Sequence, residues 1–306
     1  NMSDLELATE RFKNDPDAQK LSELRQDFQT AYLSYQAAAV HNYFATQNQA
    51  LIATSNLFPV DTAELEGFIS NRSYNFSTSA QQRGNGFPAL DYLLYGSSDP
   101  LALFTADSNR LDFLDELIAY MNNKSIDLAN SWKGNLRSNF ISNGGTQLGS
   151  SISVQLNESI IYYEVHIREN KVGIPIGRLG PNDSPFAPDD TKIEGFYLSR
   201  SNGNEDFTLS LLKASIEEME RIYLGSGTSA AETQGYDDLL QVRGHAAVDN
   251  DIKAQFASIY QEIDNRSSIS GNNELYDRVQ RLITLYKSDL FPLLNVQDAD
   301  GANDGD

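Results

Sequence analysis

The sequence contains no cysteine and only three histidines among its 306 residues. Without cysteine the chain can form neither disulfides nor thiolate metal sites. His41, His166 and His245 are scattered, and none has a partner at the i, i+4 spacing that places two ligands on one helical face. We interpret each as a structural or surface histidine, so no familiar metal or thiol chemistry is indicated.

Basic residues are also scarce, since 23 Lys and Arg stand against 43 Asp and Glu, for a net charge of -20. This charge excludes nucleic acid and anionic membrane surfaces as partners, because both are bound through cationic side chains. No apolar run approaches the ~20 residues of a membrane helix, and no signal peptide is present. We expect a soluble domain whose native leader preceded Asn1.

Apolar residues recur along most of the sequence at the three- and four-residue spacing of an α-helix. Asp15 reads as an N-cap before Pro16, and Ser108 as the cap of a later helix. Strand-like alternation is not seen, so the sequence predicts an all-α protein. The expected helices cover residues 5–12, 16–54, 87–95, 108–140, 146–170, 206–224, 236–242, 249–265 and 273–294.

Two glycines, Gly144 and Gly145, follow a long helical pattern and mark the best candidate for a domain boundary. We therefore predict two helical bundles, residues 1–143 and 144–297. The second includes a loop rich in glycine and proline, residues 173–188, which is not expected to be regular helix. Its length is typical of functional loops.

The last residues, 298–306, form an acidic tail. Asp298, Asp300 and Asp304 have the alternate spacing of calcium-binding loops, but the final bidentate acid of such loops is missing. We favour a frayed acidic tail over a calcium site and keep calcium as the alternative.

The most informative stretch is Gly86–Gly96, which reads GFPALDYLLYG. It resembles the signature of the imelysin family, also classified as peptidase family M75, which carries G-x-H-x-x-E on a helix. Gly86 matches the motif glycine. Pro88 stands at the histidine position and Asp91 at the glutamate position, so the chain resembles a divergent member.

Two later stretches extend the resemblance over nearly the whole chain. KVGIPIG, residues 171–177, follows a helix containing Glu164 and Arg168, and GYDDLL, residues 235–240, precedes a helix containing IKAQF. Together, in this order, they identify the chain as imelysin-like, or iron-regulated protein A-like.

The resemblance implies two helical bundles with a ligand site between them and a link to iron or haem uptake. It implies a place in the bacterial periplasm or at the cell surface, as an outer-membrane lipoprotein anchored before Asn1. The expected partners are a small ligand, a metal ion, haem or another envelope protein.

Proline at the histidine position of the motif changes what chemistry the motif can support. A histidine and a carboxylate together can hold a divalent ion or activate water, but proline has no ligating atom and Asp91 alone does not suffice. Pro88 and Asp91 can instead occupy the first turn of a helix, where a fixed φ and a carboxylate are favoured. A remodelled binding site is the other interpretation, and we expect no catalytic residue.

The family arrangement implies which residues such a remodelled site would combine. Arg168 and Lys171 would suit an anionic ligand, whereas Asp91 and Glu164 would suit a cation. The full set of predicted ligand-binding residues is Gly86, Phe87, Pro88, Asp91, Tyr92, Glu164, Arg168, Lys171, Tyr197 and Ser199.

The sequence therefore favours a non-catalytic binding protein of the cell envelope. Two alternatives remain open at this stage. One is a metallopeptidase of the M75 type with a remodelled site, and the other is a module that binds a protein partner in the envelope.

Overall fold

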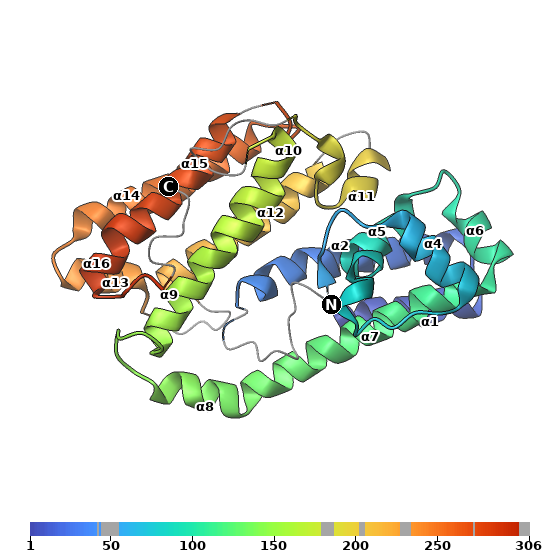
Figure 1. The fold of residues 1–306 in the computed structure, drawn as a ribbon, viewed down its shortest axis with the longest axis horizontal. Helices are drawn as coiled ribbons and strands as arrows, with labels where there is room; N and C mark the ends of the chain where they lie inside the picture. Colours follow the sequence, from blue (N-terminus) through green and yellow to red (C-terminus); the bar gives the residue numbers. More distant parts are fainter. Residues whose placement is uncertain are drawn as a thin grey trace. The chain divides into compact units, whose positions relative to one another are not determined.

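The computed structural model describes residues 1–41, 43, 55–178, 187–201, 206–226, 234–271 and 273–299. All regular secondary structure in these residues is helical, which confirms the predicted all-α class (Figure 1). Of the described helices, none combines the length and the apolarity that crossing a membrane requires. The end of the predicted helix 16–54, residues 179–186 of the predicted loop 173–188, and Asp300 and Asp304 of the calcium candidate lie outside the described residues.

The chain divides into two compact units. Unit 1 comprises residues 1–137 and 192–211, and unit 2 comprises residues 138–191 and 212–306. The first division lies close to the expected boundary at residue 143. The segment 192–211, expected in the second bundle, packs instead with unit 1, because a buried carboxylate of unit 1 binds it.

Unit 1 is built from helices whose apolar faces meet in an aromatic core. Phe12 packs edge-on against Phe104 at 5.3 Å, and Phe28 lies 5.7 Å from Tyr32. The helices assigned wholly to this unit are α1 (Met2–Asn14), α2 (Ala18–Val40), α4 (Thr62–Asn71), α5 (Gly86–Tyr95), α6 (Pro100–Ala106), α7 (Ser108–Lys133) and α11 (Phe196–Ser201).

The two expected helix caps were each misplaced by one or two residues. Asp17, and not Asp15, caps α2, and its carboxylate accepts the Lys20 N–H at 2.7 Å. Likewise Asp107, and not Ser108, caps α7. In both cases a nearby carboxylate satisfies a free N–H of the first turn.

Helix α12 (Asp206–Leu224) continues from unit 1 into unit 2. The other helices of unit 2 are α9 (Ser151–Tyr162), α10 (Ile174–Ile176), α13 (Tyr236–Val242), α14 (Ala246–Asp264), α15 (Asn273–Thr284) and α16 (Phe291–Leu294), with π-helical segments at Tyr163–Gly173 and Leu285–Leu290. The prediction that residues 173–188 form an irregular loop was wrong for residues 173–176, which are helical. Pro175 occupies the first turn of α10, and Gly177, with φ +84°, ends that helix.

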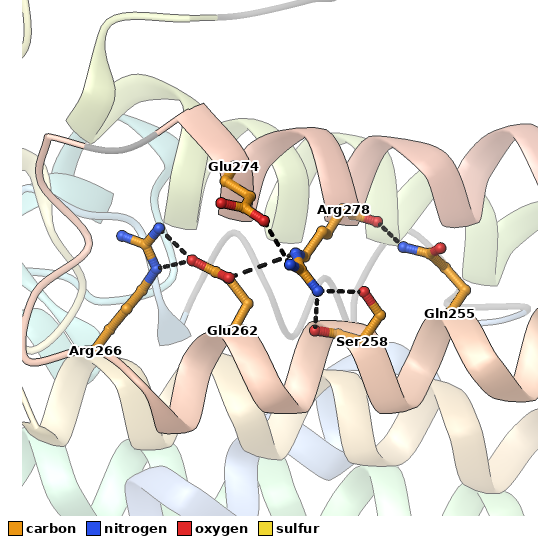
Figure 2. A network of polar contacts seen from close by, with 6 residues as sticks. All are labelled: Gln255, Ser258, Glu262, Arg266, Glu274 and Arg278. Atoms are coloured by element: carbon orange, nitrogen blue, oxygen red, sulfur yellow. Dashed lines mark hydrogen bonds and ion pairs between the residues drawn. The ribbon is translucent and has the colours of Figure 1, made fainter.

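Polar contacts hold α14 against α15 in unit 2 (Figure 2). The guanidinium of Arg278 on α15 donates to the Ser258 hydroxyl at 2.6 Å and pairs with Glu262 at 3.4 Å, both on α14. In return, Gln255 of α14 donates its amide to the Arg278 carbonyl oxygen at 2.7 Å. These bonds fix the register of the two helices.

Candidate functional site

The first residue of the motif helix α5 must be glycine. Gly86 has φ +78°, which L side chains rarely adopt, and a Cβ at this position would lie 2.5 Å from the Ser55 carbonyl oxygen. The close approach of the Ser55 backbone therefore explains the motif glycine in this chain.

The next two residues of α5 are buried. The ring of Phe87 stacks on Tyr32, with ring centres 4.5 Å apart and planes 6° apart, and lies 5.1 Å from Tyr35. Pro88 lies in the first turn of α5, as the first-turn interpretation predicts, and its missing N–H leaves no helical hydrogen bond unmade there. Both residues thus contribute to packing.

Asp91 lies beyond the first turn of α5, which corrects the expectation that it serves its own helix. Its carboxylate accepts the Tyr197 N–H on Oδ2 and the Leu198 N–H on Oδ1, each at 2.8 Å. These are first-turn donors of α11, which have no partner within that helix. Asp91 therefore caps a helix more than a hundred residues away.

The surroundings of Asp91 disfavour its charge. Only 2 % of the residue is exposed, and this burial raises the pKa of the carboxyl to about 7. The N–H groups of Tyr197 and Leu198 lower that pKa, while the negative charge of Glu194 raises it. Around neutral pH both protonation states of Asp91 are populated.

Tyr92, the neighbour of Asp91, contacts Glu66 through its hydroxyl and Tyr197 of α11 through its ring. Its hydroxyl donates to Glu66 at 2.7 Å, and Glu66 forms an ion pair with Arg110. Burial and Glu66 raise the pKa of Tyr92 to about 12, so it stays a neutral donor. Its ring lies 5.1 Å from that of Tyr197, so these two predicted site residues do meet.

Glu194 was missed by the sequence analysis. This carboxylate is 1 % exposed and accepts the side-chain amides of Gln36 at 2.9 Å and of Asn56. Its partners lie 158 and 138 positions away, so no local spacing signals the contact. Glu194 is the second buried acid of this region.

A short chain of hydroxyl groups fixes the same segment. The Thr208 hydroxyl donates to the Glu194 carbonyl oxygen at 2.7 Å and lies 2.8 Å from the Ser199 hydroxyl. Ser199 is buried, so the structure gives this predicted site residue a role in holding α11 to the start of α12.

The three predicted site residues of unit 2 share the π-helical segment Tyr163–Gly173 and are buried. Glu164 forms an ion pair with Lys287 at 2.8 Å. Arg168 donates to Gln280 at 2.6 Å. Lys171 is 2 % exposed. Such segments are frequent at functional sites, but a ligand site shared by the two units stays a prediction.

The residues at the motif do not fit a bound metal ion. Pro88 offers no ligating atom, and both Asp91 oxygens already accept N–H groups. Within the described ranges, no three His, Asp or Glu side chains are grouped so that they could hold a metal ion. The arrangement at the motif joins two helices.

Comparisons with known proteins bear on the fold and the family of this chain. No curated protein matches the chain. A solved structure, described as an iron-regulated protein A precursor from Parabacteroides distasonis, is similar with a TM-score of 0.72 and 14 % identity, covering 96 % of this chain and 88 % of that one. At this identity the likeness shows the fold. The sequence model of imelysin, peptidase family M75, matches residues 1–287, so the chain belongs to the imelysin family.

Proposed function

We propose that this imelysin-family chain is a non-catalytic binding protein of the bacterial cell envelope that takes part in iron or haem uptake. Family membership supports the proposal. The similar solved structure is described as a precursor of an iron-regulated protein, which supports both the link to iron and an exported location.

One observation carries the non-catalytic part of the proposal, namely the position of Asp91. A general base or a metal ligand needs a lone pair directed at substrate or metal. Asp91 is buried, and each of its oxygens accepts a backbone N–H of α11. With Pro88 beside it, the motif serves to fasten α11 to α5.

It follows that iron would reach this protein as a complex. The motif offers no set of ligands for a bare ion, so the proposed ligand is haem or a ferric chelate that is recognised through its organic part. Haem and ferric citrate carry carboxylates, which arginine and lysine bind. The resemblance pointed to Arg168 and Lys171 for that contact, but they are only 4 % and 2 % exposed, so other cationic residues would have to bind the ligand.

The test is a titration of the full chain with haemin and with ferric citrate, followed by visible absorption and calorimetry. We expect saturable binding of one of the two, unchanged in Asp91→Asn. Peptide hydrolysis that depends on an added metal would overturn the proposal in favour of an M75-type peptidase. If neither iron complex binds, the proposal is also overturned, and a protein partner becomes the working hypothesis.

A further inference from the structure

Unit 1 contains a pocket of about 320 Å³ that the motif chemistry does not use. Its buried walls include Tyr35, Phe87 and Met121. Met2, Leu128 and Trp132 line it closer to solvent. These residues come from α1, α2, α5 and α7, so the pocket lies entirely within one unit.

The described lining of this pocket is mainly uncharged, with the His41 imidazole and the Asn1 amino group as its ionisable groups. Of the described residues that line it, none is Asp, Glu, Lys or Arg, although such residues make up 22 % of the chain. Two of its hydroxyl groups bond to the protein itself, since Ser34 donates to the Thr30 carbonyl oxygen and Ser125 to that of Asn122, at 2.8 and 2.7 Å. The exposed wall is therefore mainly apolar.

The composition of the wall favours flat apolar ligands. Trp132 is the only tryptophan of the chain, and two of its three methionines, Met2 and Met121, line the same pocket. Aromatic rings and thioethers pack well against aromatic ligands, and methionine adapts to their shape.

The size of the pocket limits the ligand further. Its volume is about twice the ~150 Å³ of an engineered apolar cavity that takes up benzene. It is at the lower end of the range of about 300–1,000 Å³ in which small-molecule sites fall. Two fused or linked rings would fill it.

We propose that this pocket binds a small neutral molecule of one or two aromatic rings. The amino group of Asn1, which lines the pocket, is already paired with Asp4 at 2.9 Å, so a charged ligand would lose its hydration here for little electrostatic gain. The site goes beyond the proposed function, because it requires neither iron nor a residue of unit 2.

Trp132 provides a direct readout for a test on the full chain. Titration with prodan, a neutral two-ring naphthalene fluorophore that absorbs where tryptophan emits, should quench Trp132 by energy transfer and saturate at one probe per chain. We expect unlabelled biphenyl to displace the probe. Displacement by decanoate but not by biphenyl would overturn the neutral aromatic class.

A mouth-filling variant and a matched control locate the site. Ala38 on α2 and Ala129 on α7 are exposed lining residues, so Ala38→Leu with Ala129→Leu should reduce affinity for the probe about tenfold or more. Ala102→Leu on α6, exposed but outside the pocket, should leave affinity unchanged. Equal affinity in all three proteins, or no saturable binding, would overturn the proposal. Ala38→Leu alone should also weaken probe binding, followed by the probe's own fluorescence, which tests the site even if the double variant fails to fold.

Discussion

The carboxylate of Asp91 accepts the backbone N–H of Tyr197 at 2.8 Å across 106 positions of sequence. With the matching bond from Leu198, it makes the motif helix α5 the cap of α11. This contact explains both why the segment 192–211 belongs to unit 1 and why the acid at the motif position is withdrawn from solvent.

Asp91→Ala should destabilise unit 1, because two first-turn N–H groups of α11 lose their acceptor. At pH 7.5, where Asp91 is mostly ionised, we expect a loss of about 1–3 kcal/mol in urea unfolding. Protease cleavage should increase within residues 192–211. The control is Asp61→Ala, which removes the exposed cap of α4 and should cost about 1 kcal/mol without that cleavage. An Asp91→Ala protein that resists protease like wild type would contradict the capping role.

The raised pKa of Asp91 makes stability depend on pH. Its folded pKa, about 7, lies above the ordinary value of 3.8 because burial disfavours the charge. The contribution of Asp91 is therefore complete below pH ~4 and declines until about pH 7, by roughly 4 kcal/mol at most. The free energy of unfolding of wild type minus that of Asp91→Asn should fall over this range and then level off. A difference that rises with pH would show that the carboxylate is held ionised instead.

Gly86→Ala should destabilise the chain by about 2–4 kcal/mol, since it forces a side chain into a positive φ and against the Ser55 backbone. Gly67 is the matched control. It lies inside α4, and a Cβ there would meet nothing within 4 Å, so Gly67→Ala should stabilise by about 0.5–1 kcal/mol. Thermal unfolding of both variants distinguishes the two sites, and equal shifts would contradict the account of Gly86.

Features that depend on neighbouring residues could be predicted from the sequence, whereas contacts between distant segments could not. Apolar periodicity is local, so helices 206–224 and 236–242 have the predicted bounds. Caps were missed by one or two residues, because several acceptors compete near a helix start. The cap that Asp91 provides for α11 had no local signal, since donor and acceptor belong to distant segments.

Whether the predicted site residues bind a ligand stays a prediction, but the structure shows which of them lie together. The resemblance pointed to Asp91, Tyr92, Tyr197 and Ser199, and the structure brings Asp91 and Tyr92 against Tyr197. It did not point to Glu194, whose partners come from distant parts of unit 1.

The ion pair of Glu164 and Lys287 links the two π-helical segments of unit 2 with both side chains largely buried. Lys287→Met should cost about 3–5 kcal/mol, because it leaves the Glu164 charge buried without this partner. Adding Glu164→Leu should recover much of that loss in urea unfolding. Arg72→Ala, which breaks an exposed pair with Asp112, is the control and should cost less than about 1 kcal/mol. Additive losses from the two buried substitutions would contradict the pairing.

The central claim, that the motif position of this chain caps a helix and binds no metal, is tested most directly by elemental analysis. Wild type and Asp91→Asn are incubated separately with ferrous, ferric, zinc and calcium ions, desalted, and measured for metal per chain. The account predicts the same metal content for both proteins with every ion. Retention of one metal ion per wild-type chain, lost in Asp91→Asn, would contradict it and restore a metal site at the motif.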